Sequence, residues 1–338
     1  MLTIDRTETI YSDGTHNAFT SMVRWHDKYF VAFRSAGSHA TPWEDGWGDS
    51  PATYGKIMLL ESGDLKTWTQ SVILDSEYDD RDPKLLATAN RLYVFSTTII
   101  GPARLTMPQE TYMSFTEDGQ TWCRPVSAYR YNYGYWKPQT YAGVHYVAAD
   151  VDITRPKVEI RDQQVELLSS ADGQLWQSVS VIVRSAHCTE TELLFLADGA
   201  LLAFTRPHYV SIARPPYTSW SVAGAALPDR VKEHPTGYSG PAAARVGDTL
   251  MFSCRTRKQD HPDDQPGDGR TGLFTIDPAD YSLTWHTNLA TEWGGDQSYA
   301  GMVALDERQL VMCYYDGEAY QPGVPRRSDI KLATVSVG

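Results

Sequence analysis

The sequence is poor in the features that mark metal-binding, membrane-spanning and nucleic-acid-binding proteins. Its four cysteines stand singly, without the paired spacing of a zinc site, and we expect them to be buried free thiols. No apolar run approaches the roughly 18 residues of a transmembrane helix, so the sequence predicts no membrane partner. Acidic residues number 42 against 30 basic ones, and this net charge of −12 argues against a nucleic-acid partner.

The start of the chain also lacks the basic and then apolar pattern of a secretory signal. The sequence as written therefore predicts a cytoplasmic protein, or a secreted one if a signal segment has been removed. What the chain does have is a 41% apolar share, many aromatic residues, 25 glycines and 19 prolines. This composition predicts a folded protein with a substantial core and many turns.

A short motif recurs three times at a fixed interval. It reads Ser/Thr-x-Asp-x-x-x-Trp at residues 62–68, 116–122 and 170–176, with its tryptophans 54 residues apart. A weaker echo ends at Trp285. We expect each copy to form a turn whose tryptophan anchors the strand that follows.

A second repeat is an apolar strand that follows a turn. Its copies cover residues 28–34, 91–97, 144–150, 200–206, 249–255 and 309–315. The mean spacing is about 56 residues, and the near-continuous apolar character is typical of strands buried on both faces. Repeats of this size, built from strands without helical periodicity, indicate a β-propeller.

The repeats predict an all-β fold, a single-domain six-bladed β-propeller spanning residues 1–338, with four antiparallel strands in each blade. The last blade is one strand short, since only residues 298–305, 309–315 and 329–337 read as strands there. The segment 3–10 is also strand-like. We expect this N-terminal strand to complete the last blade and close the ring, because an open edge would otherwise remain.

Equivalent ends of the apolar strands should converge on one rim of a propeller. Those ends are Arg34, Thr97, Asp150, Arg206, Arg255 and Tyr315. Three arginines in such positions predict a pocket that binds an anionic substrate, with guanidinium groups that form bidentate hydrogen bonds to a carboxylate. The other interpretation is that these arginines pair with channel acids such as Asp150 and serve the architecture only.

The strands that precede these copies also begin with polar residues. They include Glu190, Tyr299 and Arg81, and His16 stands at the corresponding place in the first unit. A tyrosine beside arginines and a carboxylate base can attack a substrate or remove a proton. Taken alone, Tyr299 fits an aromatic residue packed at the rim better than a catalytic one.

With these residues in place, the chain resembles the sialidase (neuraminidase) superfamily. The three Asp-containing turns look like its Asp-box repeats, and the segments around Glu190 and Tyr299 follow its order. The resemblance implies that Tyr299 is the nucleophile, that Glu190 activates it, and that Arg206 and Arg255 hold the substrate carboxylate. The predicted function is therefore removal of a terminal acidic sugar, such as sialic acid or a related ulosonic or uronic sugar.

The sequence departs from the family pattern at two places. The segment 16–19 has no arginine where the family places its first one, and Arg34 or Arg81 is expected to compensate. The family's acidic residue is also missing after the second strand, where His39 stands instead. His39 is then either a general acid or an ordinary loop histidine. Further acidic candidates for this role are Glu44, Asp45 and Asp49.

These departures leave other functions open. His16, His39, Tyr299 and the arginines would also suit a propeller lyase acting on uronates, or a histidine-dependent glycosidase acting on rhamnose-containing glycans. A sugar-binding propeller without catalysis is a third interpretation. No cofactor is predicted, and the oligomeric state is left open. The acidic loop 258–270 either covers the pocket, binds calcium through its carboxylates, or is an ordinary solvated loop. The loop 43–47 carries two tryptophans suited to stacking on sugar rings.

Overall fold

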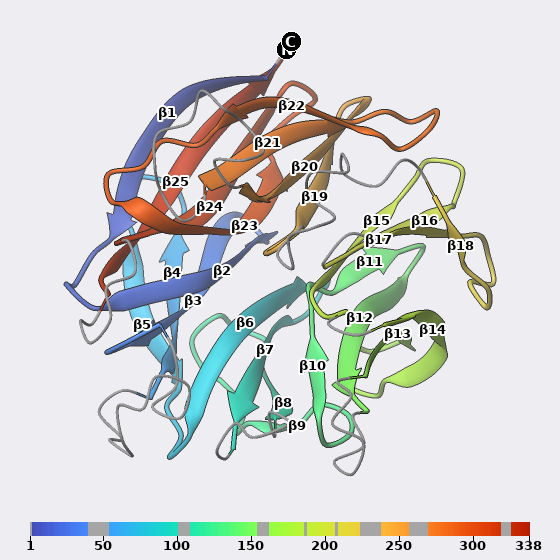
Figure 1. Ribbon diagram of the computed structural model, residues 1–338. Helices are drawn as coiled ribbons and strands as arrows, with labels where there is room; N and C mark the ends of the chain where they lie inside the picture. Colours follow the sequence, from blue (N-terminus) through green and yellow to red (C-terminus); the bar gives the residue numbers. More distant parts are fainter. Residues whose placement is uncertain are drawn as a thin grey trace.

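The computed structural model shows a protein built from β-strands around a central axis (Figure 1). No helix that could cross a bilayer occurs among the described residues. The described residues are 2–39, 54–100, 109–153, 162–185, 188–206, 209–223, 238–256, 270–318 and 326–338.

Four sheets form separate blades whose strands pair antiparallel. The first contains β6 (Asp79–Ala87), β7 (Leu92–Ile99), β8 (Gln109–Thr116) and β9 (Val126–Ser127). The second contains β10 (Tyr133–Tyr135), β11 (Gln139–Tyr141), β12 (Val144–Asp152), β13 (Gln163–Ser170) and β14 (Gln177–Ser185). The third contains β15 (Thr191–Phe195), β16 (Leu201–Thr205), β17 (Tyr209–Ala213) and β18 (Ser221–Val222). The fourth contains β19 (Ala242–Val246), β20 (Thr249–Thr256), β21 (Arg270–Ile276) and β22 (Leu283–Asn288).

The fifth sheet has eight strands and contains both ends of the chain. One group is β2 (His16–Trp25), β3 (Lys28–Ala36), β4 (Lys56–Ser62) and β5 (Thr69–Leu74). The other is β23 (Gly294–Ala304), β24 (Gln309–Glu318), β25 (Ser328–Val337) and β1 (Leu2–Tyr11). A single parallel pair, His16 with Ser328, joins the two groups.

The propeller arrangement of four-stranded antiparallel blades is therefore confirmed, but six separate blades are not found. The structure separates four blades, because the pair between β2 and β25 merges the remaining strands into one sheet. Strand β1 pairs antiparallel with β25 from Leu2–Val337 to Tyr11–Ile330. The two ends of the chain consequently lie side by side in Figure 1.

The apolar repeats form β3, β7, β12, β16, β20 and β24, the second strand of each four-strand unit. All eight residues of β7 and all five of β16 are buried, as expected of strands covered on both faces. The four cysteines are free, and all but the half-buried Cys123 are buried.

The three Asp-containing segments adopt one hydrogen-bonded turn. In the first, the Asp64 carboxylate accepts hydrogen bonds from the backbone N–H groups of Thr67 and Lys66, each at 2.8 Å. These bonds lower the pKa of Asp64 to about 2. Asp118 and Asp172 accept the equivalent pairs of bonds. The carboxylate thus satisfies backbone donors that the tight turn leaves without a strand partner.

The axis of the propeller is closed below the site by Trp136 and Lys137, which follow β10. The indole of Trp136 donates to the Pro241 carbonyl at 3.1 Å. The Lys137 ammonium donates to the carbonyls of Pro241 and Ala300 at 2.8 and 2.6 Å. One short segment therefore ties together the inner strands β19 and β23, and it gives the pocket above a rigid floor.

Candidate active site

A cavity of about 330 Å³ opens at the centre of the propeller, above Trp136. Inner strands of several sheets supply its walls, so residues far apart in the sequence meet there. The predicted site residues that line it are His39, Arg81, Asp150, Glu190, Arg206, Arg255 and Tyr299.

Three of the inner strands carry a bulge that turns a side chain toward this cavity. The register shifts in β2, β6 and β23, and within these shifts Phe19, Asp82 and Tyr299 adopt left-handed φ values of 61°, 50° and 57°. A non-glycine residue in this conformation costs on the order of 1–3 kcal/mol, and such strain concentrates at functional sites. All three side chains line the cavity.

Tyr299 and Glu190 form the central pair of the site. The tyrosine Oη donates a hydrogen bond of 2.5 Å to Glu190 Oε1. Arg206 Nη1 donates to the same oxygen at 2.8 Å, and the Gly240 N–H donates to Oε2 at 2.6 Å. Burial alone would raise the pKa of Glu190, but Arg206 and these hydrogen bonds hold it below its usual value. Burial and the Glu190 charge raise the pKa of Tyr299 well above its usual value, so the proton stays on the tyrosine.

Arg255 is held rigidly beside this pair. Its Nε donates to the Gln297 carbonyl at 2.8 Å, and Nη2 contacts Tyr315 Oη at 2.6 Å and Asp296 Oδ1 at 2.7 Å. The guanidinium lies 5.5 Å from the ring centre of Tyr299. Arg255 and Arg206 both line the cavity, where guanidinium groups suit an anionic ligand.

Two predicted residues lie behind the cavity wall and correct the sequence interpretation. Tyr315 is fully buried; its hydroxyl accepts from Arg255 and donates to Asp296 Oδ2 at 2.9 Å. It therefore fixes the arginine and does not face a ligand. His16 is also buried, next to His39, with the ring centres 4.9 Å apart.

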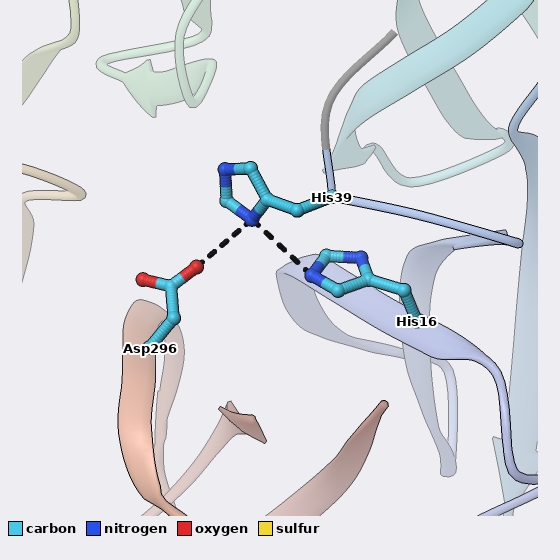
Figure 2. Close-up of side chains that lie close together, drawn as sticks. All are labelled: His16, His39 and Asp296. Atoms are coloured by element: carbon cyan, nitrogen blue, oxygen red, sulfur yellow. Dashed lines mark hydrogen bonds and ion pairs between the residues drawn. The ribbon is translucent and has the colours of Figure 1, made fainter. Parts of the chain in front are cut away.

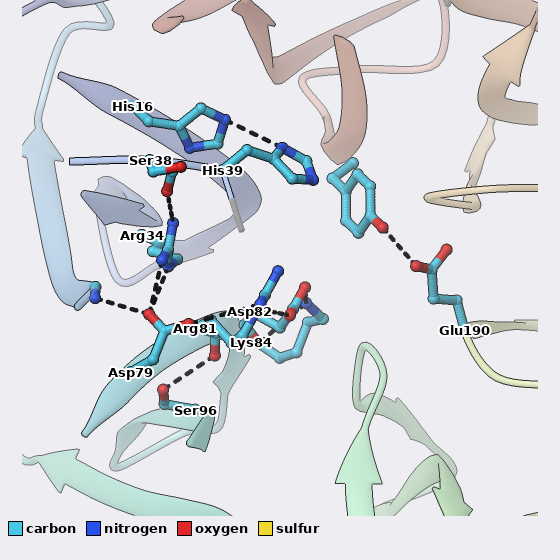
Figure 3. Close-up of polar contacts among 12 residues, drawn as sticks. His16, Arg34, Ser38, His39, Asp79, Arg81, Asp82, Lys84, Ser96 and Glu190 are labelled. Carbon is cyan, nitrogen blue, oxygen red and sulfur yellow. Dashed lines mark hydrogen bonds and ion pairs between the residues drawn. The ribbon is translucent and has the colours of Figure 1, made fainter. Parts of the chain in front are cut away.

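Among the described residues, Arg34 likewise does not line the cavity. Its side chain is fully buried, and Nε and Nη2 donate to Asp79 Oδ1 at 3.0 and 2.7 Å. Nη1 donates to the Ser38 carbonyl at 2.7 Å. Figure 3 shows this cluster apart from Glu190. A buried guanidinium needs such partners, so the architectural interpretation of arginines applies to Arg34.

Arg81 does line the cavity, but acidic residues also contact its guanidinium group. Its Nε donates to Asp82 at 3.2 Å, Nη1 lies 3.6 Å from Asp79, and its guanidinium lies 5.0 Å from the Phe19 ring centre. Phe19 therefore lines the cavity on segment 16–19, which has no arginine of its own, and the Arg81 guanidinium packs against the Phe19 ring.

Asp150 faces the cavity from the end of β12. Burial, with the nearby charge of Glu190, raises the pKa of Asp150 to about 7. It is therefore a carboxyl group that changes its charge near neutral pH. Together with Asp82 and Glu190, it makes this wall of the pocket more acidic than the arginine count alone suggests.

His39, His16 and Asp296 form a contiguous network at the edge of the cavity (Figure 2). His39 Nδ1 lies 2.9 Å from Asp296 Oδ2 and 3.2 Å from His16 Nε2. Among the described residues, this is the one group of three potential metal ligands close together. Arg255 and Arg326 already ion-pair with the carboxylate, at 2.7 and 3.8 Å, and their positive charge disfavours a cation there. We therefore assign the network to hydrogen bonding.

Sequence reasoning missed Asp296 and Gly240. Asp296 stands three residues before Tyr299, on the same inner strand. Gly240 is needed because a Cβ there would lie 2.8 Å from the Tyr299 ring. No local pattern marks either residue. The predicted candidates Glu44, Asp45 and Asp49, the loop 43–47 and residues 258–269 lie outside the described residues.

No family model matches the sequence, and no curated protein matches it. Solved structures do match in fold. A protein of unknown function from Dyadobacter fermentans superposes with a TM-score of 0.72 and 18% identity, covering 100% of this chain and 99% of that one. Trypanosoma rangeli sialidase, in complex with the inhibitor DANA, gives 0.70 and 11%, covering 94% of this chain and 55% of that one. Phage phi92 endosialidase gives 0.70 and 9%, covering 99% and 70%.

These likenesses show that the chain has the fold of sialidase-like propellers. It spans little more than half of the Trypanosoma rangeli sialidase chain. At such low identities they leave the activity of this chain to be argued from its own residues.

Proposed function

We propose that the protein is a sialidase-like exo-glycosidase that removes a terminal acidic sugar. The observation that carries the proposal is the 2.5 Å hydrogen bond between Tyr299 and Glu190, in a cavity that Arg206 and Arg255 also line. A buried tyrosine paired with a carboxylate has the geometry of a nucleophile and its base. The two arginines offer donors for the carboxylate that an acidic sugar carries.

In this proposal the substrate helps to activate the tyrosine. Before binding, Arg206 stabilises the charge on Glu190 and keeps it a weak base. A substrate carboxylate that binds Arg206 offsets this positive charge and raises the proton affinity of Glu190. As Tyr299 Oη bonds to the anomeric carbon, its proton passes to Glu190 and the bond to the leaving oxygen breaks. Glu190 returns the proton when water later displaces the tyrosine.

The test combines trapping with turnover. Trypanosoma rangeli sialidase was solved with 2,3-difluorosialic acid as a covalent intermediate, and the same reagent suits this chain. We expect one equivalent to add to the protein and to map to Tyr299. Tyr299→Phe should lose the label and at least about 1,000-fold in turnover of acidic aryl glycosides, whereas Tyr131→Phe, at an exposed position, should match the parent. Labelling elsewhere, or unchanged turnover in Tyr299→Phe, would contradict the proposal.

A lyase acting on uronate glycans is the second candidate. The observation that favours it is the presence of His39 in the same cavity as Tyr299 and the arginines, where an imidazole could take the α-proton of a neutralised uronate. Its product is unsaturated and absorbs in the ultraviolet. If a panel of uronate polysaccharides yields no such product, the lyase is excluded. Binding of an acidic sugar that Arg206→Ala abolishes, without cleavage by the parent, would instead indicate a binding module.

For the architecture, we propose that the eight-stranded sheet is two blades and that the ring therefore has six. In the described part of the chain, His16–Ser328 is the single strand pairing between the two groups of four strands. In this arrangement residues 1–338 form one domain, β1 supplies the outer strand of the last blade, and the three Asp-containing turns are Asp boxes.

A further inference from the structure

We propose that Asp296 is a positioning residue that links the carboxylate-binding Arg255 to His39, and that His39 Nε2 donates the proton to the departing sugar oxygen. This inference rests on the proposed glycosidase function and supplies the acid that the sequence leaves unassigned. One carboxylate makes both contacts, through Oδ1 to Arg255 at 2.7 Å and through Oδ2 to His39 Nδ1 at 2.9 Å.

The contacts of Asp296 determine which nitrogen of His39 carries hydrogen. Despite its burial, Asp296 is held ionised by Arg255 and His39, so its pKa lies far below its usual value. An ionised oxygen 2.9 Å from Nδ1 requires a hydrogen on that nitrogen, because two lone pairs would repel at this distance. His39 Nε2 is therefore the nitrogen that gains and loses the proton.

His16 fits this assignment. It is fully buried, and burial, followed by the neighbouring His39 and Arg34, lowers its pKa well below the usual value. It is therefore neutral, and its Nε2, 3.2 Å from His39 Nδ1, is a second and more distant acceptor for the hydrogen that Nδ1 donates to Asp296. Its hydrogen then lies on Nδ1, a buried atom without a hydrogen-bond partner among the described residues. A buried N–H group without an acceptor costs free energy. We infer that the protein bears this cost because His16 helps to hold the His39 ring in its orientation.

His39 stands where it can serve the nucleophile. Phe19 lies between them, with ring-centre distances of 5.5 Å to His39 and 5.0 Å to Tyr299, and both side chains line the cavity. The charged and titratable groups around His39 come from several strands. They are His16 from β2, Arg81 and Asp82 from β6, Glu190 before β15, Arg255 from β20, Asp296 and Tyr299 from β23, Tyr315 from β24, and Arg326 before β25.

The proton transfers balance over one turnover. The hydrogen on His39 Nε2 moves to the leaving oxygen as Tyr299 bonds to the anomeric carbon, and the neutral imidazole later takes a proton from the attacking water. Asp296 stays ionised throughout and stabilises the imidazolium.

The test compares two leaving groups, so that a loss of proton donation can be told apart from a loss of the other catalytic steps. A 4-nitrophenyl glycoside of sialic acid has a good leaving group that needs little protonation, whereas a methyl glycoside depends on an acid. We expect His39→Gln to lose at least about 100-fold on the methyl glycoside and less than about 10-fold on the nitrophenyl one. Asp296→Asn, which removes the charge that contacts His39 Nδ1, should show the same bias between the two glycosides. The control His286→Gln, remote from the cavity, should match the parent on both.

A second measurement does not depend on activity. Nitrogen-15 NMR of the histidine side chains, with His39 assigned by its absence in His39→Gln, should show hydrogen on Nδ1 of the neutral ring. Hydrogen on Nε2 instead, or equal losses on both glycosides in His39→Gln, would overturn the inference. If the parent cleaves neither glycoside, the glycosidase proposal fails and the donor role with it, while the NMR result still decides whether Asp296 orients His39. If Asp296→Asn does not fold, His39→Gln and the parent spectrum still decide.

Discussion

At the scale of the residue, arginines in equivalent positions of the repeats have different surroundings. Arg34, Arg206 and Arg255 all stand at the ends of apolar strands. Arg206 and Arg255 reach the cavity, whereas Arg34 is enclosed with Asp79. All three guanidinium groups pair with a carboxylate, Arg34 with Asp79, Arg206 with Glu190 and Arg255 with Asp296. The difference is that only Arg206 and Arg255 also border the open pocket.

This difference predicts opposite effects of two substitutions. Arg34→Ala leaves Asp79 buried without its main partner and should lower the free energy of unfolding by about 3–5 kcal/mol. Arg206→Ala should instead weaken binding of an acidic sugar while changing stability much less. Urea unfolding followed by tryptophan fluorescence, with ligand titration, measures both. Arg184→Ala, which breaks an exposed ion pair with Asp162, serves as the control and should change stability little. A stable Arg34→Ala protein that cannot bind the sugar would restore Arg34 to the site.

At the scale of the element, bulges in the inner strands place side chains on the wall of the cavity. A regular strand alternates its side chains between two faces, so it cannot aim consecutive residues at one point. The register shifts in β2, β6 and β23 release Phe19, Asp82 and Tyr299 from that alternation. The bulge in β23 also requires a glycine on the neighbouring segment, where Gly240 has a φ of 63°.

Gly240→Ala tests this packing directly. A Cβ at Gly240 would lie 2.8 Å from the ring and 2.9 Å from the backbone nitrogen of Tyr299, so either the tyrosine or the Gly240 backbone, which donates to Glu190, must shift. We expect turnover to fall by at least about tenfold, since misplacement of reacting groups is costly. Gly143→Ala is the matched control, because it has a φ of 80° but nothing within 4 Å of the added carbon. It should cost only the roughly 1 kcal/mol of the strained backbone. Equal turnover in the two variants would show that Tyr299 does not depend on Gly240.

At the scale of the whole molecule, the ends of the chain hold the ring together. Strand β1 pairs with β25, more than 300 residues away in the sequence. Leu2 is buried in a cluster that also contains Val335 and Leu310. Without β1, β25 would be an exposed edge and this cluster would face solvent.

Deletion of residues 1–11 should therefore destabilise the entire propeller. We expect a lower melting temperature, and association through the exposed edge that size-exclusion chromatography detects. A synthetic peptide of residues 1–12 should restore the melting temperature by adding the missing strand, while a scrambled peptide should not. If the shortened protein melts like the parent, β1 has no closing role.

The sequence by itself determined the kind of fold and the central pair of the site. Strand periodicity and the 54-residue turn repeat are local patterns that any chain position reveals, so they predicted a propeller of four-stranded antiparallel blades. They also predicted a strand at residues 3–10. They indicated Glu190 and Tyr299 as site residues, because equivalent positions of the repeats converge at one rim of a propeller.

Only the tertiary structure decided what each of those residues touches. That Asp79 neutralises Arg34, that Tyr315 supports Arg255 from behind, and that Asp296 joins Arg255 to His39 are contacts between blades. The merging of β2 with β25 into one sheet is of the same kind. Such contacts depend on bulges and on side-chain direction across the axis, and residues up to several blades apart leave no joint pattern in a single sequence.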